Sequence, residues 1–302
     1  MAQKSFRYLA FMYNIIIRYL KLCLIRLFWL ISLIDKQSLS SIYMDTISEQ
    51  LFSELLKCIQ AEKAQLIKDK KIRKQKPLSP ISEDEKPFAL PEGWVWCRLG
   101  ELCDFITKGT TPPASELLKN GEIPYLKVYN IVNQKIDFHY KLQYIRRHVH
   151  ENLLARSRVY PNDVLMNIVG PPLGKVAIVP HDFQEWNINQ AIAIFRSIEP
   201  KLYKYIYLFL IEGAPIRAVE LKGVVGQDNI SLTQSRELLM AMPPLPEQKA
   251  IVAKVEKLLV VCDQLERQIT NNQTHANALM QAVLKEAFTS SNNQIEQVAA
   301  HA

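Results

Sequence analysis

The sequence lacks the cysteine patterns of a disulfide framework or a zinc site. Its five cysteines are odd in number and form no C-x-x-C pair: Cys23, Cys58, Cys97, Cys103 and Cys262. Disulfide-rich secreted domains carry even sets of cysteines, and zinc knuckles carry closely paired ones. We therefore expect a protein of the reducing cytoplasm, with no structural metal.

Signatures of common catalytic sites are also missing. The six histidines show no H-E-x-x-H spacing, no G-x-S-x-G elbow occurs, and paired carboxylates are confined to residues 83–85. The Asn/Asp-Pro-Pro-aromatic motif with which adenine methyltransferases grip a base is absent as well. The sequence indicates a binding protein that holds no cofactor, rather than an enzyme.

One glycine-rich stretch imitates a phosphate loop without matching it. In residues 170–176 three residues separate the glycines instead of four, and Val176 stands where a Ser or Thr would bind magnesium. We expect a tight turn between strands here, with Gly174 supplying a special backbone dihedral and Lys175 pointing outward.

No apolar run is clean enough for a membrane span. Residues 8–34 are strongly apolar, but three basic residues interrupt them: Arg18, Lys21 and Arg26. A basic amphipathic helix on a membrane surface is one interpretation. The other is that residues 1–43 are an upstream extension and that Met44 is the working start, since everything after it is patterned as a soluble protein.

What is present fits a folded protein of one large or two modest domains. The 302 residues are 48% hydrophobic and 22% charged, close to ordinary globular values. Lys and Arg number 37 against 30 Asp and Glu, which gives a net charge of +7. This excess suits a polyanionic partner such as nucleic acid without requiring one.

Apolar periodicity predicts an amphipathic helix over residues 44–76. Its basic end, from Lys68 to Lys76, either contacts DNA phosphates or is a solvated terminus that complements the helix dipole. Three prolines within residues 77–87 then break the helix and predict a linker.

Residues 88–245 carry most of the strand signal, so we expect one mixed α/β domain. Short β-branched segments bounded by Gly and Pro predict strands over 125–131, 163–169, 175–180 and 190–198. Helix-like segments at 202–212 and 215–222 lie among them. The strands need not be parallel.

Residues 246–288 predict a long coiled-coil helix, followed by a polar tail over 289–302. Pro246 is favoured at the first helical position and Glu247 in the first turn. Apolar residues then recur at alternating spacings of four and three: Ile251, Val255, Leu258, Cys262, Leu265, Ile269, Leu279 and Val283. Such a helix needs a partner helix. The alternative is a core helix of the same domain.

Several segments, in order and spacing, resemble the DNA-specificity subunit of type I restriction-modification systems. They are LPEGWVWCRLGEL (90–102), TKGTTPP (107–113), IPYLKVYNI (123–131), VGPPLGKVAIV (169–179), NINQAIAIFR (187–196) and DNISLTQSRELLMAMPPLPEQKAIVAKVEKL (228–258). The resemblance implies a target-recognition domain for double-stranded DNA, flanked by an N-terminal helix and a long spacer helix. It also implies docking of a methyltransferase subunit and an endonuclease subunit.

The chain departs from this family in one respect. A usual member has two recognition-domain-plus-helix units in tandem, whereas this chain has one, so the resemblance implies half a subunit that reads one half of a bipartite target. Either two copies pair through the heptad helix, or a different second half is needed. A membrane-surface coiled-coil scaffold and a truncated, nonfunctional remnant remain as other hypotheses.

Candidate DNA-binding residues lie at loops and strand ends of the α/β domain. Polar side chains there would contact base edges, while Lys and Arg would hold phosphates. The candidates are Lys108, Thr110, Thr111, Lys127, Tyr129, Asn130, Arg146, Arg147, Lys175, Asn189 and Gln190. Structural alternatives remain: Tyr129 as core, Asn130 as a turn residue, and Arg146 with Arg147 as a solvated face.

Overall fold

A computed structural model describes residues 47–72, 74–170, 172–213 and 229–299. These residues belong to two compact units, one ending at Val252 and the other beginning at Ala253. The N-terminal apolar segment and the helix-like segment 215–222 lie outside the described residues. Within the described part of the chain, no helix is long and apolar enough to cross a membrane.

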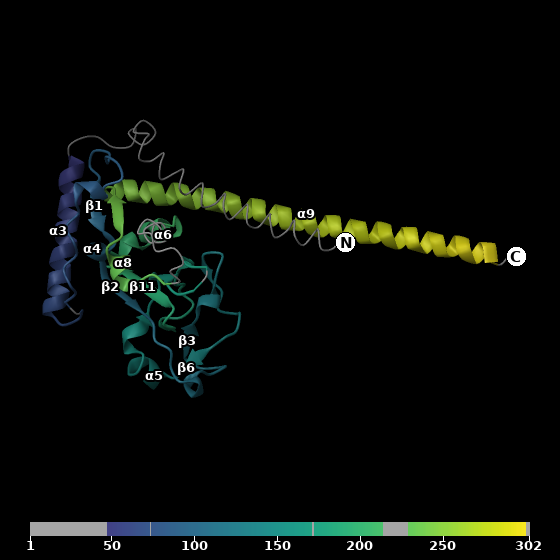
Figure 1. Cartoon of the computed structure of the whole chain (residues 1–302), viewed down its shortest axis with the longest axis horizontal. Helices are drawn as coiled ribbons and strands as arrows, with labels where there is room; N and C mark the ends of the chain where they lie inside the picture. The colour runs from purple at the N-terminus through teal and green to yellow at the C-terminus, as the bar shows by residue number, and fades with distance from the viewer. Residues whose placement is uncertain (1–46, 73, 171, 214–228, 300–302) are drawn as a thin grey trace. The chain divides into compact units, whose positions relative to one another are not determined.

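In the first helix, α3 (Ile47–Lys68), one lysine bonds to the α/β domain. The ammonium group of Lys63 donates hydrogen bonds to the carbonyl oxygens of Gly100 and Cys103, at 2.6 and 2.8 Å. Gly100 lies in the short helix α4 (Leu99–Leu102). Figure 1 shows α3 alongside α4 and β1.

Helix α3 is shorter than the helix predicted over residues 44–76, because its end is capped at Lys68. Lys70 adopts a left-handed conformation with φ 58°, and the N–H of Lys71 donates to the carbonyl of Leu66 at 2.9 Å. This is the geometry of a helix C-terminus closed by a left-handed residue. The described lysines of the basic run are exposed, and a phosphate contact there stays a prediction.

The predicted linker over residues 77–87 is held against the domain by a buried arginine. Arg98 is 4% exposed, and its guanidinium donates to the carbonyl oxygens of Ser79 and Pro80, both at 3.2 Å. It also donates to the carboxylate of Glu85, at 2.8 and 3.0 Å. Because Arg98 bonds to three residues of the linker, the linker follows a defined path along the domain.

Two strands far apart in the sequence join the ends of the α/β domain. β1 (Val95–Arg98) pairs antiparallel with β12 (Leu239–Met242). The helices α6 (Tyr203–Ile211) and α8 (Leu232–Arg236) lie between these two strands in the sequence. The Tyr205 phenol donates to the carbonyl of Ala241 at 3.0 Å, which ties α6 to β12.

Two four-stranded sheets form the body of the domain. One has the order β2 (Cys103–Lys108), β11 (Ile192–Ser197), β8 (Val164–Asn167) and β9 (Val176–Ile178), and all its pairs are antiparallel. The other has the order β6 (Tyr144–Ile145), β3 (Ile123–Leu126), β10 (Trp186–Ile188) and β7 (Arg158–Val159). Only β3 and β10 are parallel among the pairs of this sheet. The predicted mixed α/β fold is confirmed.

The strand predicted over residues 125–131 is interrupted. β3 ends at Leu126, a 3₁₀ turn (Val128–Asn130) follows, and a small hairpin of β4 (Ile131–Val132) and β5 (Lys135–Ile136) comes next. The cause is Asn130, whose side-chain oxygen accepts the N–H of Lys127 at 3.0 Å and turns the chain. The other three predicted strands contain β8, β9 and β11.

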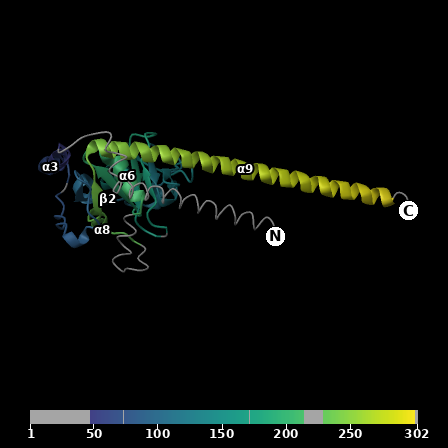
Figure 2. The same ribbon diagram turned by 90° about the horizontal axis from the view of Figure 1, so that it is seen from above.

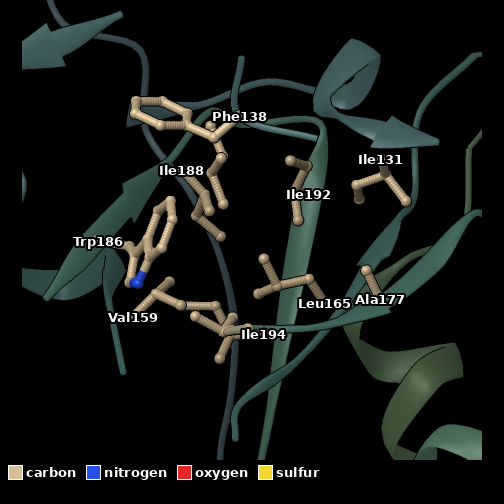
Figure 3. Close-up of a cluster of buried hydrophobic side chains, with 11 residues drawn as sticks. Ile131, Phe138, Val159, Leu165, Ala177, Trp186, Ile188, Ile192 and Ile194 are labelled. Atoms are coloured by element: carbon tan, nitrogen blue, oxygen red, sulfur yellow. The ribbon is translucent and has the colours of Figure 1, made fainter. Parts of the chain in front are cut away.

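The core of the domain is an apolar cluster shared by the two sheets (Figure 3). Ile192 and Ile194 lie on one face of β11, and Trp186 and Ile188 lie on one face of β10, because side chains two residues apart share a face. All four are 0% exposed. Helix α6 packs on β8 and β9. Figures 1 and 2 show where α6 lies.

The last helix, α9, runs without a break from Leu245 to Ala299. It begins one residue before the predicted Pro246 and continues past the predicted end at residue 288. Val252 and Ala253, in its early turns, mark the boundary between the two units.

Candidate nucleic-acid interface

Two parallel strands end side by side at one edge of the α/β domain. Leu126 of β3 lies opposite Ile188 of β10, and the N–H of Asn189 donates to the carbonyl of Leu126 at 3.0 Å. Parallel strands point the same way, so the residues that follow them, Lys127 and Asn189, emerge at the same edge.

Gly109 packs the loop after β2 onto this edge. Its N–H donates to the carbonyl of Ile192 at 3.0 Å, and the N–H of Thr110 donates to the carbonyl of Ile188 at 3.2 Å. A Cβ atom on Gly109 would lie 2.2 Å from the carbonyl oxygens of both Ile188 and Asn189. Only glycine permits this approach of two backbones.

Side chains then hold the two loops together. The hydroxyl of Thr111 donates to the side-chain oxygen of Gln190, and the phenol of Tyr125 donates to the carbonyl of Thr110 at 2.8 Å. Burial raises the pKa of Tyr125 to about 12, so this phenol stays protonated. Predicted residues thus meet in what we call the loop cluster: exposed Lys108, Thr111 and Gln190, with half-buried Thr110, Lys127 and Asn189.

Arg156 joins the loop cluster, although the sequence did not point to it. It lies in a 3₁₀ turn (Ala155–Ser157), and its guanidinium donates to the hydroxyl of Thr110 at 3.4 Å. The arrangement depends on β7, which follows this turn and pairs with β10 at Arg158 and Asn187. No sequence pattern marks this pairing, because β7 is only two residues long.

Lys175 lies at the same end of the antiparallel sheet as Lys108, directly before the outer strand β9. Its backbone exchanges hydrogen bonds with Asn167, which faces Ile192 on the next strand. Three strand spacings separate β2 from β9, so Lys175 lies roughly 14 Å from Lys108 across the sheet. Gly174 has the predicted special dihedral, with φ 74°. However, β8 ends at Asn167 and β9 begins at Val176, so the connection is longer than the predicted tight turn.

Arg146 and Arg147 lie away from the loop cluster. They follow β6, which runs antiparallel to β3, so they lie at the opposite end of β3. Arg146 forms an ion pair with Glu116 at 3.0 Å, and Arg147 forms ion pairs with Glu122 at 2.9 Å and Glu185 at 3.1 Å. Their charges are already compensated, which makes them poor phosphate ligands in this arrangement.

Of the two interpretations given above for Asn130, the structure favours a turn residue over a contact to a base. It is 1% exposed, and its amide donates to the carbonyl oxygens of Asp137 and Tyr140 at 3.0 and 2.9 Å. Tyr129 is half-buried and meets the ring of Tyr140 edge to face, with 5.8 Å between ring centroids. We therefore leave Asn130 out of the contact surface and keep Tyr129 at its margin.

The cations of the loop cluster, and Lys175 beside it, remain available to an anion. Among the described residues, no ion pair is found for Lys108, Lys127, Arg156 or Lys175. The described part of the chain also holds no group of three or more His, Cys, Asp or Glu side chains placed to bind a metal. The edge thus combines uncompensated positive charge with amide and hydroxyl groups, the set that contacts phosphates and base edges.

Comparisons with known proteins identify relatives of this chain. The family model described as "Type I restriction modification DNA specificity domain" matches residues 91–273. The EcoEI specificity subunit of Escherichia coli, a type I restriction enzyme component, is 33% identical over 77% of this chain and 41% of its own length. The EcoAI specificity subunit of Escherichia coli is 32% identical, covering 77% of this chain and 40% of the relative.

A solved structure of a type I restriction-modification system contains a chain of similar fold. Its TM-score is 0.52 at 21% identity, and the match covers 80% of this chain and 57% of that one. The two chains therefore share a fold.

The chain belongs to the family of type I restriction-modification DNA specificity proteins. The resemblance seen in the sequence is confirmed. The chain spans about two fifths of the length of the curated relatives, with 41% and 40% of each covered.

Proposed function

We propose that the loop cluster, with Arg156 and Lys175, binds double-stranded DNA and recognises one half of a bipartite target. The observation that carries this proposal is the convergence of three strand ends, those of β2, β3 and β10, at one edge that carries uncompensated positive charge. Membership of the DNA-specificity family supports the choice of DNA over another polyanion.

The chain itself is non-catalytic in this proposal. It delivers a methyltransferase subunit and an endonuclease subunit to the target in the cytoplasm. Its relatives are named as specificity subunits of type I restriction enzymes, which supports this role. Purified chain incubated with S-adenosylmethionine and duplex DNA is expected to transfer no methyl groups. Turnover by the chain alone would contradict the proposal.

Helix α9 supplies the means of pairing two halves. The early seam residues Ile251, Val255 and Cys262 are at most 8% exposed, whereas Leu279 and Val283 are 67% and 56% exposed. Exposed apolar side chains at heptad positions are typical of a helix that lacks its coiled-coil partner. We infer that the distal seam pairs with a second copy or with a different half-subunit.

The test is to map methylated adenines in a host without its own restriction-modification systems. The full chain is expressed with the neighbouring methyltransferase subunit, and genomic DNA is read by single-molecule sequencing. A palindromic bipartite motif indicates two copies, because a two-fold dimer recognises a two-fold site. The absence of any motif would contradict pairing of identical copies.

A further inference from the structure

The loop of residues 137–143 is anchored in the core by Phe138. This side chain is 9% exposed and meets the rings of Tyr144, Phe183 and Trp186 edge to face, with centroid distances of 5.3, 5.8 and 5.4 Å. Figure 3 shows Phe138 above Trp186 and beside Ile188. Edge-to-face contacts on several sides leave this ring little freedom.

Asn130 forms the second anchor of the same loop. Its amide N–H groups donate to the carbonyl oxygens of Asp137 and Tyr140, while its oxygen accepts the N–H of Lys127. A buried amide satisfied at each end fixes the segments it joins, because removing it leaves buried partners without a bond. One side chain thus sets the positions of both Lys127 and the loop.

What the anchored loop presents to solvent is an aromatic ring and a cation. Tyr140 is 50% exposed, and the exposed Lys141 has its ammonium 5.1 Å from the ring of Tyr140 and 5.5 Å from the ring of Tyr129. Lys141 adopts φ 52°, a conformation that glycine or asparagine usually occupies.

The charge of Lys141 is free for a ligand. Among the described residues, none forms an ion pair with it. The carboxylate of Asp137, in the same loop, accepts the backbone N–H of His139 at 3.1 Å. A cation held over one exposed and one half-buried aromatic ring, and not neutralised, is a suitable contact for a phosphate.

Tyr140 and Lys141, the Tyr140–Lys141 pair, adjoin the loop cluster. Tyr125, four residues before Tyr129 in the chain, bonds through its phenol to the carbonyl of Thr110 in the loop cluster. Lys127 belongs to the loop cluster and shares the Asn130 turn with Tyr129. The Tyr140–Lys141 pair therefore continues the basic edge beyond the end of β3.

We propose that Tyr140 and Lys141 form a further DNA contact, with Lys141 on a phosphate and Tyr140 packed beside it, and that Asn130 is the residue that positions them. This inference rests on the proposed DNA-binding function. It replaces a direct base contact by Asn130 with an indirect role, since Asn130 is 1% exposed and both N–H groups of its amide are already bonded.

The test measures binding of a mixed-sequence duplex to the full chain by fluorescence anisotropy at increasing salt. Lys141→Gly removes the ammonium while keeping a residue suited to positive φ. The slope of log affinity against log salt is expected to fall in magnitude by about 1, the amount lost with one phosphate contact. Lys141→Arg is expected to restore the slope.

A matched control separates this contact from the loss of net charge. Arg146→Gln also removes one positive charge, but Arg146 is paired with Glu116 at the other end of β3, so the slope is expected to stay unchanged. An unchanged slope for Lys141→Gly, with normal binding by the wild type, overturns this inference alone. A wild type that binds no duplex at low salt overturns the proposed function as well.

The positioning role of Asn130 is tested by a double-mutant cycle. Asn130→Ala is expected to reduce the salt slope, and adding Lys141→Gly to it is expected to change the slope little further. A full additional effect would show that Asn130 acts only on folding. Near-UV circular dichroism shows whether Asn130→Ala folds. If it does not, Phe138→Leu, which loosens the other anchor, takes its place in the double-mutant cycle with Lys141→Gly.

Discussion

Gly109 determines whether the loop cluster can assemble. Because its missing Cβ would lie 2.2 Å from two backbone oxygens, Gly109→Ala forces the loops apart. We expect a loss of roughly 1–3 kcal/mol in unfolding free energy, typical of overpacking, together with weaker DNA binding. Urea denaturation and anisotropy measure the two effects.

Gly170 provides the control for this substitution. Nothing lies within 4 Å of a Cβ built there, although its φ is 78°. Asparagine tolerates that conformation, so Gly170→Asn is expected to cost less than about 1 kcal/mol. Equal losses for the two variants would contradict the steric account of Gly109.

His150 makes stability depend on pH. It is 0% exposed, and its Nδ1 lies 3.1 Å from the amide nitrogen of Asn187, a contact that favours the neutral ring. Burial lowers its pKa, and nearby Arg158 and Arg147 lower it further, although Glu185 acts in the opposite direction. In the unfolded chain the imidazole of His150 titrates at its ordinary pKa of 6.5, so below this pH the unfolded state binds more protons than the folded state. The contribution of His150 to the folding stability is therefore fully present above pH 6.5 and is lost as the pH falls below it.

The measurement compares urea unfolding at pH 8, 6 and 5. We expect the wild type to lose more stability on acidification than His150→Gln, which cannot titrate. The difference between the two proteins removes the contribution of carboxylates common to both. A parallel decline in both proteins would show that His150 contributes nothing to the pH dependence.

Among the elements, α3 depends on Lys63. This ammonium donates to the carbonyl oxygens of Gly100 and Cys103, and burial lowers its pKa. Lys63→Met keeps the aliphatic length and removes both bonds, so we expect a loss of about 1–3 kcal/mol. Lys57→Met, at an exposed position of the same helix, is the control. Limited proteolysis after α3 is expected to accelerate only in the Lys63 variant.

At the scale of the whole molecule, pairing through α9 requires its distal seam. Leu279→Arg with Val283→Arg places charge on that seam, so we expect the paired species to dissociate into single chains in light-scattering measurements. Gln281→Arg, between them and exposed, is expected to leave pairing intact. The wild type running as a single chain would contradict pairing of identical copies, and a different half-subunit would then be the remaining partner.

The sequence by itself determined the parts whose causes are local. The heptad spacing from Ile251 onward predicts the long helix, Pro246 and Glu247 predict its start to within one residue, and the special dihedral expected at Gly174 is present, with φ 74°. Local backbone preference and side-chain periodicity are enough in each case.

Only the tertiary structure decided which polar residues share a surface. Lys127 and Asn189 meet because β3 and β10 pair in parallel, and Arg156 joins them through a strand too short to show a pattern. Arg146 and Arg147 look like a basic patch in the sequence, yet carboxylates from distant segments compensate them. Charge compensation and strand pairing are long-range properties, so neither follows from the order of residues in one segment.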